Sequence, residues 1–153
     1  MEPNGTSRRT YYSTYRFGLD DKRRLQVPSK WRPDDPDFQF TMVIWPKARE
    51  GTCLRVMPPE VMDKVAQQLE TMANSDPGKP ALRRLIGGGA EVVAVDKAGR
   101  ITLPNHMTEA AGIKDQAVLV GMVDRFEIWS PERFEKVQIS DAIMGQEAFR
   151  MLE

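Results

Sequence analysis

The chain has 153 residues, of which 41% are hydrophobic and 29% charged, and its 22 basic and 22 acidic residues give a formal net charge of zero. This is the composition of an ordinary globular protein and excludes a disordered chain, and no apolar run approaches the roughly 20 residues that cross a bilayer. Cys53 is the single cysteine, so no disulfide can form within the chain, and we expect a reducing cytoplasmic location.

Residues 1–14 are interpreted as an N-terminal extension, which we expect to be flexible because chain termini commonly are. The extension lacks the apolar core of a secretory signal. It contains Arg8 and Arg9 and begins a basic region, since residues 1–32 hold eight basic and three acidic residues. Residues 124–153 hold four basic and seven acidic residues. A neutral chain can therefore present a basic face if the fold gathers its N-terminal charges; the alternative is a solvated surface of scattered charge.

One motif occurs twice. The segment LDDKRRLQVPSKW (19–31) returns as VDKAGRITLPNHM (95–107), with an offset of 76 residues. TMVIW (41–45) aligns with AVLVG (117–121) at the same offset, and CLRVMPPEVMDKV (53–65) aligns with RFEIWSPERFEKV (125–137) at an offset of 72, so the first copy has a longer turn around PKAREG. This pattern indicates a duplication. The expected organisation is a first repeat at 15–73, a linker at 74–91, a second repeat at 92–138 and a tail of helical pattern at 139–153.

Each repeat follows the same local pattern. LQV (25–27) and ITL (101–103) alternate apolar and polar residues, as half-buried strands do, and the next proline can begin a helical turn. PNHMTEAAG predicts a short helix that ends at Gly112. Two strands follow, at 41–45 and 53–57 or at 117–122 and 125–129, and a helix begins after Pro59 or Pro131, with Ser130 as a suitable N-cap. So few strands cannot form a stable sheet alone. We therefore predict an α+β fold in which two ββαβ-type halves form one barrel around a pseudo-two-fold axis.

The repeated motif, Asp-x-x-x-Arg, is a turn. Asp20 and Asp96 can accept hydrogen bonds from backbone amides two or three residues on, and Gly99 is free to take a positive φ. The arginine that follows resumes a strand and can pair with the aspartate. On one interpretation the two side chains only staple a hairpin.

The other interpretation gives the same turns a role in DNA binding. A tight turn would place Lys22, Arg23 and Arg24, or Lys97 and Arg100, at a protruding tip. Arginine can donate two hydrogen bonds to a guanine edge or clamp a phosphate, whereas lysine contacts phosphate as a point charge. Residue types alone do not decide between the two interpretations.

The segments LDDKRRLQVPSKWR, ALRRLIGGGAE, VDKAGRITLP and AGIKDQAVLVGMVDRFEIWSPERFE together resemble the MraZ family of bacterial transcriptional regulators. The resemblance implies a swapped-hairpin, AbrB-like β-barrel with short flanking helices, in a ring-like homo-oligomer. It implies binding to promoter repeats ahead of the cell-division and cell-wall gene cluster, and hence a cytoplasmic, nucleoid-associated protein. The family's DNA-contacting basic residues fall on Lys22, Arg24 and Arg100. Arg23 stands where the family usually has glycine, at a cost of about 1 kcal/mol.

The sequence also bears on two other classes of function, an enzyme and a binding module without DNA. An enzyme is not expected, because His106 is the only histidine, Cys53 fits a packed position, and IGGGAE lacks the Lys-Ser/Thr of a phosphate loop and reads better as a flexible link. No cofactor, metal, membrane or small-molecule substrate is expected. The alternative to DNA binding is an oligomeric scaffold or antitoxin-like protein-binding module. Its interface would use Trp45, Trp129 and Phe134, with Phe126 in the core.

Overall fold

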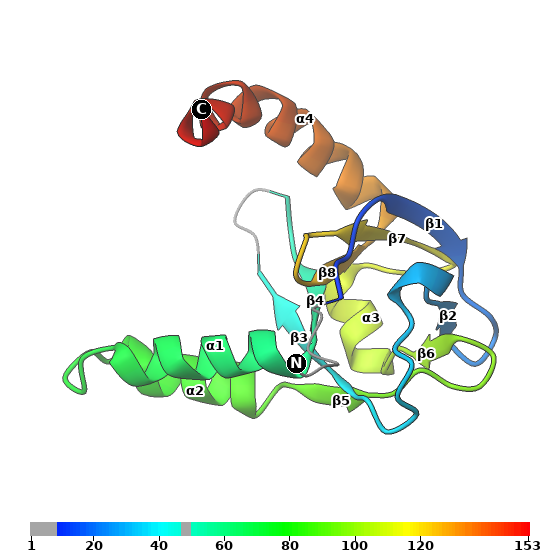
Figure 1. Cartoon of the computed structure of the whole chain (residues 1–153), viewed down its shortest axis with the longest axis horizontal. Coiled ribbons are helices and arrows are strands. Elements are labelled where there is room, and N and C mark those ends of the chain that lie inside the picture. The colour runs from blue at the N-terminus through cyan, green and yellow to red at the C-terminus, as the bar shows by residue number, and fades with distance from the viewer. Residues whose placement is uncertain (1–8, 47–49) are drawn as a thin grey trace, which may run out of the picture.

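A computed structural model describes residues 9–46 and 50–153. The strands are β1 (Thr14–Gly18), β2 (Arg24–Gln26), β3 (Phe40–Trp45), β4 (Cys53–Met57), β5 (Glu91–Val93), β6 (Arg100–Thr102), β7 (Gln116–Gly121) and β8 (Phe126–Trp129). The helices are α1 (Pro59–Thr71), α2 (Gly78–Gly87), α3 (Asn105–Ala111) and α4 (Pro131–Ala148), with short 3₁₀ segments η1 (Ser29–Trp31) and η2 (Phe149–Leu152) (Figure 1). The predicted α+β class is confirmed.

The strands form two antiparallel sheets. Six of them hydrogen-bond in the order β1-β7-β8-β4-β3-β5, and β2 pairs with β6 in a separate two-stranded ribbon. The closed barrel expected from the sequence is not found, because β1 and β5 remain as edges of the six-stranded sheet in the described part of the chain. The ribbon instead covers one side of the sheet and encloses the core against it.

The two repeats are related by a pseudo-two-fold axis and exchange their first strands. Leu25 pairs with Ile101 across the ribbon, and Arg55 pairs with Glu127 across β4 and β8, so equivalent residues of the two repeats meet at both places. Strand β1 of the first repeat pairs with β7 of the second, whereas β5 of the second repeat pairs with β3 of the first. Each repeat therefore needs the other to complete its sheet.

The connection between ribbon and sheet differs between the repeats. The second repeat has the predicted helix α3, closed by Gly112 in the left-handed conformation with φ of 69°. The first repeat has only the single turn η1, followed by a loop to β3. Pro33 and Pro36 lie in that loop and oppose helix continuation. The helical turn predicted after Pro28 is therefore present, but the first repeat lacks a full short helix such as α3.

This difference shifts the alignment of the central strands by one residue. Thr41 pairs with Met57, and Val118 pairs with Trp129. Met57 and Trp129 are equivalent residues of the two repeats, at the offset of 72. Thr41 consequently corresponds to Val118, an offset of 77, so the sequence alignment of 41–45 with 117–121 was wrong by one residue. The loop of the first repeat is one residue shorter than the helical connection of the second.

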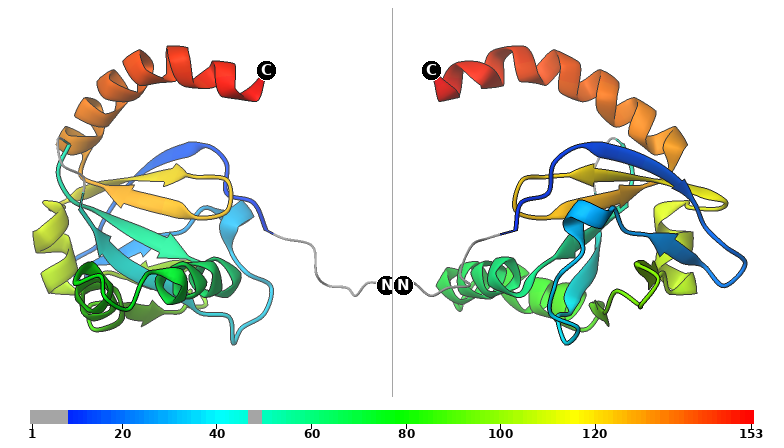
Figure 2. Two further views of the ribbon diagram at one scale, coloured as in Figure 1. Left: turned by 90° about the vertical axis from the view of Figure 1, so that its left-hand side faces the viewer. Right: turned by 45° about the vertical axis from the view of Figure 1, so that its right-hand side comes forward.

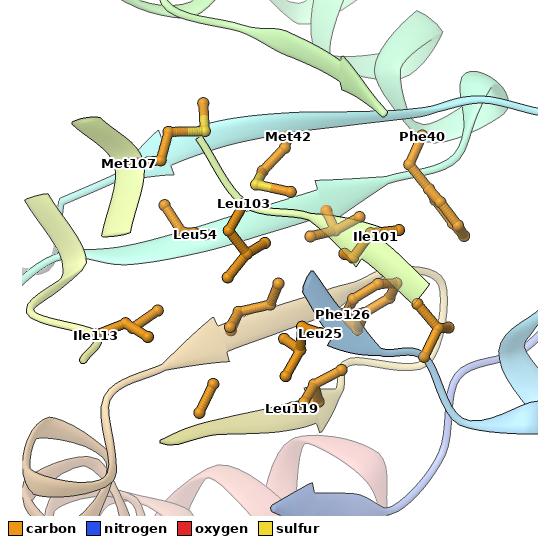
Figure 3. Packing of buried hydrophobic residues seen from close by; sticks show 14 of the residues in the cluster. Leu25, Phe40, Met42, Leu54, Ile101, Leu103, Met107, Ile113, Leu119 and Phe126 are labelled. Atoms are coloured by element: carbon orange, nitrogen blue, oxygen red, sulfur yellow. The ribbon is translucent and has the colours of Figure 1, made fainter. Parts of the chain in front are cut away.

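The main core lies between the ribbon and the sheet. Leu25 and Ile101 from the ribbon are almost fully buried against Phe40, Phe126 and Leu119 of the sheet (Figure 3). Burial of a leucine or isoleucine side chain stabilises a fold by about 1.5–3 kcal/mol. The alternation of LQV and ITL thus fixes the ribbon against the sheet and leaves its other face to solvent.

Helices α1 and α2 lie side by side on the outer face of β3 and β4 (Figure 1). The range 74–91, interpreted as a linker, contains the helix α2. Ile86 of α2 is buried with Val61 and Val65 of α1. The Lys79 ammonium donates to two backbone carbonyls at the end of α1 and to the Asn74 side chain. Helix α2 is thus fixed on α1.

The ends of the chain also have structure. Tyr11, within the range interpreted as the extension, is 1% exposed and bridges to Val123. Arg9 donates to the Lys30 carbonyl and pairs with Asp34, whereas Arg8 lies outside the described residues, as do positions 47–49 of PKAREG. The tail is helical as predicted, because α4 continues to Ala148. None of the helices in the described ranges is long and apolar enough to cross a membrane.

Candidate nucleic-acid interface

The first repeated turn has the predicted aspartate chemistry. Oδ1 of Asp20 accepts hydrogen bonds from the amides of Lys22, at 3.0 Å, and Arg24, at 2.8 Å. The amide of Arg23 donates to the Asp20 carbonyl, and Arg23 has a φ of 62°. An arginine therefore occupies the left-handed conformation in which glycine is free, at a cost of about 1 kcal/mol.

The second turn repeats the arrangement with glycine in that position. Oδ1 of Asp96 accepts from the amides of Ala98 and Arg100, both at 2.9 Å. Gly99 donates to the Asp96 carbonyl and has a φ of 84°. The two turns thus share one backbone geometry although only one of them contains glycine.

Both aspartates are stabilised as carboxylates. The hydrogen bond from the Arg24 amide, followed by the bond from its side chain, holds the pKa of Asp20 below its usual value. The Arg100 amide and the nearby Arg100 charge do the same to the pKa of Asp96. The turns therefore keep their anionic caps at neutral pH.

The ribbon brings the arginines of the two turns together. The Asp20 carboxylate lies 2.7 Å from Nε of Arg24 and 3.6 Å from Nη1 of Arg100. The Arg100 Nε atom lies 3.3 Å from Asp96. Two guanidinium groups separated by 76 positions in sequence thus share one carboxylate. In Figure 1, β2 and β6 lie together on the right-hand side of the molecule, away from the ends of α1 and α2.

The outer face of the ribbon holds four polar side chains. Leu25 and Ile101 point into the core, and side chains alternate along a strand. The face that points away from the core therefore carries the neighbouring residues Arg24, Gln26, Arg100 and Thr102. Gln26 and Thr102 were not among the predicted site residues, although the apolar–polar alternation would have identified them. A two-stranded ribbon with arginine and glutamine on its face has the shape and the donors that read a major groove.

Lys22 and Lys97 are exposed in the two turns, next to this face. Lys22 stands two residues after Asp20, whereas Lys97 directly follows Asp96. An ammonium group in such a position can contact a phosphate as a point charge. The structure therefore groups four of the five predicted DNA-contacting residues at the ribbon.

Arg23 is the fifth, and the structure does not bring it to this face. Its guanidinium donates to Oγ1 of Thr108 in α3, and its side chain is half-buried. In the second turn the relationship is reversed, because a Cβ atom on Gly99 would lie within 2.6 Å of three atoms of the Arg32 guanidinium. Arg23 corresponds to Gly99 and Arg32 to Thr108. Each turn therefore packs against one guanidinium, which comes from Arg23 of the turn itself in the first case and from Arg32, outside the turn, in the second.

The remaining candidates take structural positions. His106 is exposed on α3, and Cys53 is buried with Val118 in the sheet. Trp129 is 1% exposed in the same cluster, so its side chain packs within this chain rather than on an open surface. Phe126 is in the core as predicted. Among residues 9–46 and 50–153, no cluster of three or more potential metal ligands occurs.

Comparisons with known proteins give one consistent result. Residues 86–150 match the family model described as "MraZ protein, putative antitoxin-like". A protein of Caulobacter vibrioides (strain NA1000 / CB15N) named "Transcriptional regulator MraZ" is 34% identical over 147 residues, which cover 93% of this chain and 90% of that protein. Proteins of the same name from Leuconostoc mesenteroides and Roseiflexus castenholzii are 36% and 32% identical, over 81% and 83% of this chain and 83% and 85% of their own lengths.

Proposed function

The chain belongs to the MraZ family, and we propose that it is a transcriptional regulator that binds double-stranded promoter DNA through the β2–β6 ribbon. One observation carries the assignment of the site. Arg24 and Arg100, the arginines of the two repeated motifs, lie on the same solvent face and share the Asp20 carboxylate. A hairpin staple alone would not require the two repeats to bring these groups together.

The chemistry of the ribbon supports direct reading of bases. A two-stranded β-ribbon fits the major groove, which is about 12 Å wide. Asp20 holds Nε of Arg24 and Asp96 faces Nε of Arg100, which orients each planar guanidinium before DNA arrives. The terminal nitrogens then donate to guanine O6 and N7, and Gln26 has the amide that pairs with adenine. Lys22 and Lys97 neutralise phosphates beside the bases.

The small number of charges explains why several subunits are needed. Lys22, Lys97 and the two arginines of one ribbon are offset in part by Asp20 and Asp96, so one ribbon binds DNA weakly. A ring of several subunits raises the effective concentration of each further ribbon at tandem sites, without any new type of contact. We assign this ring to promoter repeats of the cell-division and cell-wall gene cluster. The protein would then be cytoplasmic and associated with the nucleoid. The exchange of first strands between the repeats supports the swapped-hairpin, AbrB-like class for this fold.

A protein-binding module is the second candidate, favoured by the antitoxin-like description of the matched family model. The two functions make different demands on the ribbon. A scaffold needs only its turns to be folded, whereas a DNA reader needs the guanidinium groups of Arg24 and Arg100. Neither proposal involves catalysis.

The test is a gel shift and footprint on the DNA upstream of the chain's own gene. Arg24→Ala and Arg100→Ala are expected to weaken binding at least tenfold, while Arg24→Lys does not restore it because lysine cannot form the paired contacts. Arg125→Ala is the matched control, since Arg125 is also half-buried and bonded to a neighbouring aspartate, in the β7–β8 hairpin. Wild-type affinity in the Arg24 and Arg100 variants would refute the ribbon assignment. A wild-type protein that shifts no promoter DNA at low salt would favour the scaffold.

A further inference from the structure

Helix α4 is the counterpart of α1 in the second repeat, but its surroundings differ. In the first repeat, Ile86 of α2 fills the space beside α1 and is 8% exposed. The apolar residues around Ile86 are Val43, Met57, Val61 and Val65, with Trp45, Met62, Leu69 and Ala90 partly buried at the edge. Helix α2 thus supplies the side chain that closes the first repeat.

The equivalent space in the second repeat is a cavity. It has a volume of about 290 Å³ and lies between α4 and the strands β7 and β8. Its lining includes Val120, Trp129, Phe134, Val137 and Asp141. By the offsets of 77 and 72 these are the counterparts of Val43, Met57, Met62, Val65 and Leu69, the residues around Ile86. The cavity is far larger than the roughly 30 Å³ of a water molecule, so it has room for a side chain.

Helix α4 also has apolar side chains that the fold leaves uncovered. Ile139 and Ile143 are 66% and 70% exposed on one side, and Met144, beside the cavity, is 67% exposed. No residue of α4 is buried. Exposed apolar side chains gathered on one element mark a surface that another protein can cover. Figures 1 and 2 show that the C-terminal half of α4 stands clear of the sheet.

We propose that the cavity beneath α4 receives Leu85 from helix α2 of a second copy of this chain. Leu85 is 71% exposed, one residue before the buried Ile86, so it points away from α1. The same helix, α2, plays the equivalent part within the first repeat. A second copy therefore brings to α4 the element that α1 already has.

Charge supports the same occupant. Helix α2 contains no acidic residue, and its Arg84 is exposed next to Leu85, whereas residues 131–153 contain five acidic and three basic residues. Glu50 and Asp141 stand among the cavity-lining residues. Docking of α2 would thus place Arg84 beside these carboxylates around an apolar centre, the arrangement of a specific protein interface.

The contact would be head-to-tail. Helix α2 and the free half of α4 lie on opposite sides of the molecule (Figure 2), so each copy can donate one α2 and accept another. Such a heterologous contact closes into a ring when the rotation between copies permits. The inference rests on the proposed function, because it names the contact between subunits of the proposed ring.

Two variants, each lacking one half of the contact, provide the test. Leu85→Asp removes the donor side chain, and Met144→Arg blocks the acceptor cavity with a charge that repels Arg84. Both positions are exposed, so each variant should fold, and circular dichroism checks this. Native mass spectrometry of the full chain should give a ring for wild type and single chains for each variant. An equimolar mixture should give dimers only, because one intact donor remains for one intact acceptor. Val92→Asp, at another exposed apolar residue, should keep the ring.

The outcomes separate the proposals. A ring that survives Leu85→Asp overturns this contact, while the proposed ring stands. If only Met144→Arg loses the ring, the contact is also overturned, and a contact between two α4 helices is indicated instead. A mixture that remains monomeric overturns the head-to-tail arrangement. A monomeric wild type refutes the ring and this contact together, and the gel shift with Arg24→Ala still tests the ribbon. If the aspartate variant unfolds, Arg84→Glu and Asp141→Lys replace it: each should weaken the ring and the double variant should restore it.

Discussion

The Arg55 guanidinium and the Glu127 carboxylate lie 3.2 Å apart where β4 pairs with β8, on the axis that relates the two repeats. The Glu127 side chain is only 5% exposed and also accepts a hydrogen bond from Nε1 of Trp129, at 2.9 Å. The Arg55 guanidinium stacks over the Trp45 ring at 3.9 Å. The seam between the repeats thus contains a buried ion pair with neighbours on both sides.

Glu127→Gln should therefore be strongly destabilising. It leaves the Arg55 charge buried without its counterion, which typically costs about 3–5 kcal/mol. Urea unfolding measures the free energy, with Glu147→Gln as control, because Glu147 forms a highly exposed ion pair with Arg150 and should change stability by less than about 1 kcal/mol. A loss below about 1 kcal/mol in Glu127→Gln would show that the pair is solvated. The apolar pair Arg55→Met with Glu127→Leu should recover much of the loss.

Gly99→Ala should destabilise the second turn through Arg32. The added Cβ would overlap the Arg32 guanidinium, which donates from Nε to the Val27 carbonyl at 2.8 Å. We expect a cost of about 2 kcal/mol, from the left-handed φ and the lost hydrogen bond. In an Arg32→Ala background the cost should fall to about 1 kcal/mol, because only the backbone strain remains. A double-mutant cycle by denaturant unfolding measures the coupling, and purely additive effects would contradict the contact.

Arg23 should position the first turn without contacting phosphate. Lys22→Ala should reduce the slope of log affinity against log salt by about 0.9, the value for one lost phosphate contact. Arg23→Gly should leave that slope unchanged, because the Arg23 guanidinium is directed at Thr108. The double variant Arg23→Gly with Thr108→Arg copies the arrangement of the second turn and should bind DNA with the wild-type slope. A reduced slope in Arg23→Gly would instead place Arg23 on the DNA.

Acid should weaken the two turns. The pKa of Asp20 and of Asp96 is lowered in the folded state, first by the amide hydrogen bonds from Arg24 and Arg100. Their contribution to stability is therefore complete above the ordinary aspartate pKa and is lost as the pH falls through the lowered values. Urea unfolding from pH 7 to pH 3 should show a smaller loss in the double variant Asp20→Asn, Asp96→Asn than in wild type. Equal acid dependence would mean that other carboxylates dominate.

Tyr11→Phe should leave the fold unchanged or stabilise it slightly. The Tyr11 hydroxyl is buried without a hydrogen-bond partner among the described residues, and burial, reinforced by the Glu60 charge, raises its pKa to about 12. Removing an unsatisfied hydroxyl costs little. Tyr11→Ala should cost about 3–5 kcal/mol, because the ring packs against Trp31 and Phe40. Thermal and urea unfolding compare the two variants, and a loss above about 1.5 kcal/mol in the phenylalanine variant would indicate a partner for the hydroxyl.

Local chemistry made several features predictable from sequence. The aspartate-capped turns depend on amides within four residues, the α4 start on the Ser130 cap, and the end of α3 on Gly112. The duplication was visible because both repeats retain these short-range signals. Each of these features is decided by groups that are neighbours along the chain, so the pattern of residues suffices to find them.

The sequence by itself therefore determined the two turns, their strands and their pseudo-symmetry. Only the tertiary structure decided that Arg24 and Arg100 meet over Asp20, that Arg23 is directed at Thr108, and that the central strands are offset by 77 residues. These relationships join residues more than 70 positions apart, and they follow from the pairing of β2 with β6 and of β4 with β8. Such pairing is fixed by burial across the whole core, which no local pattern records.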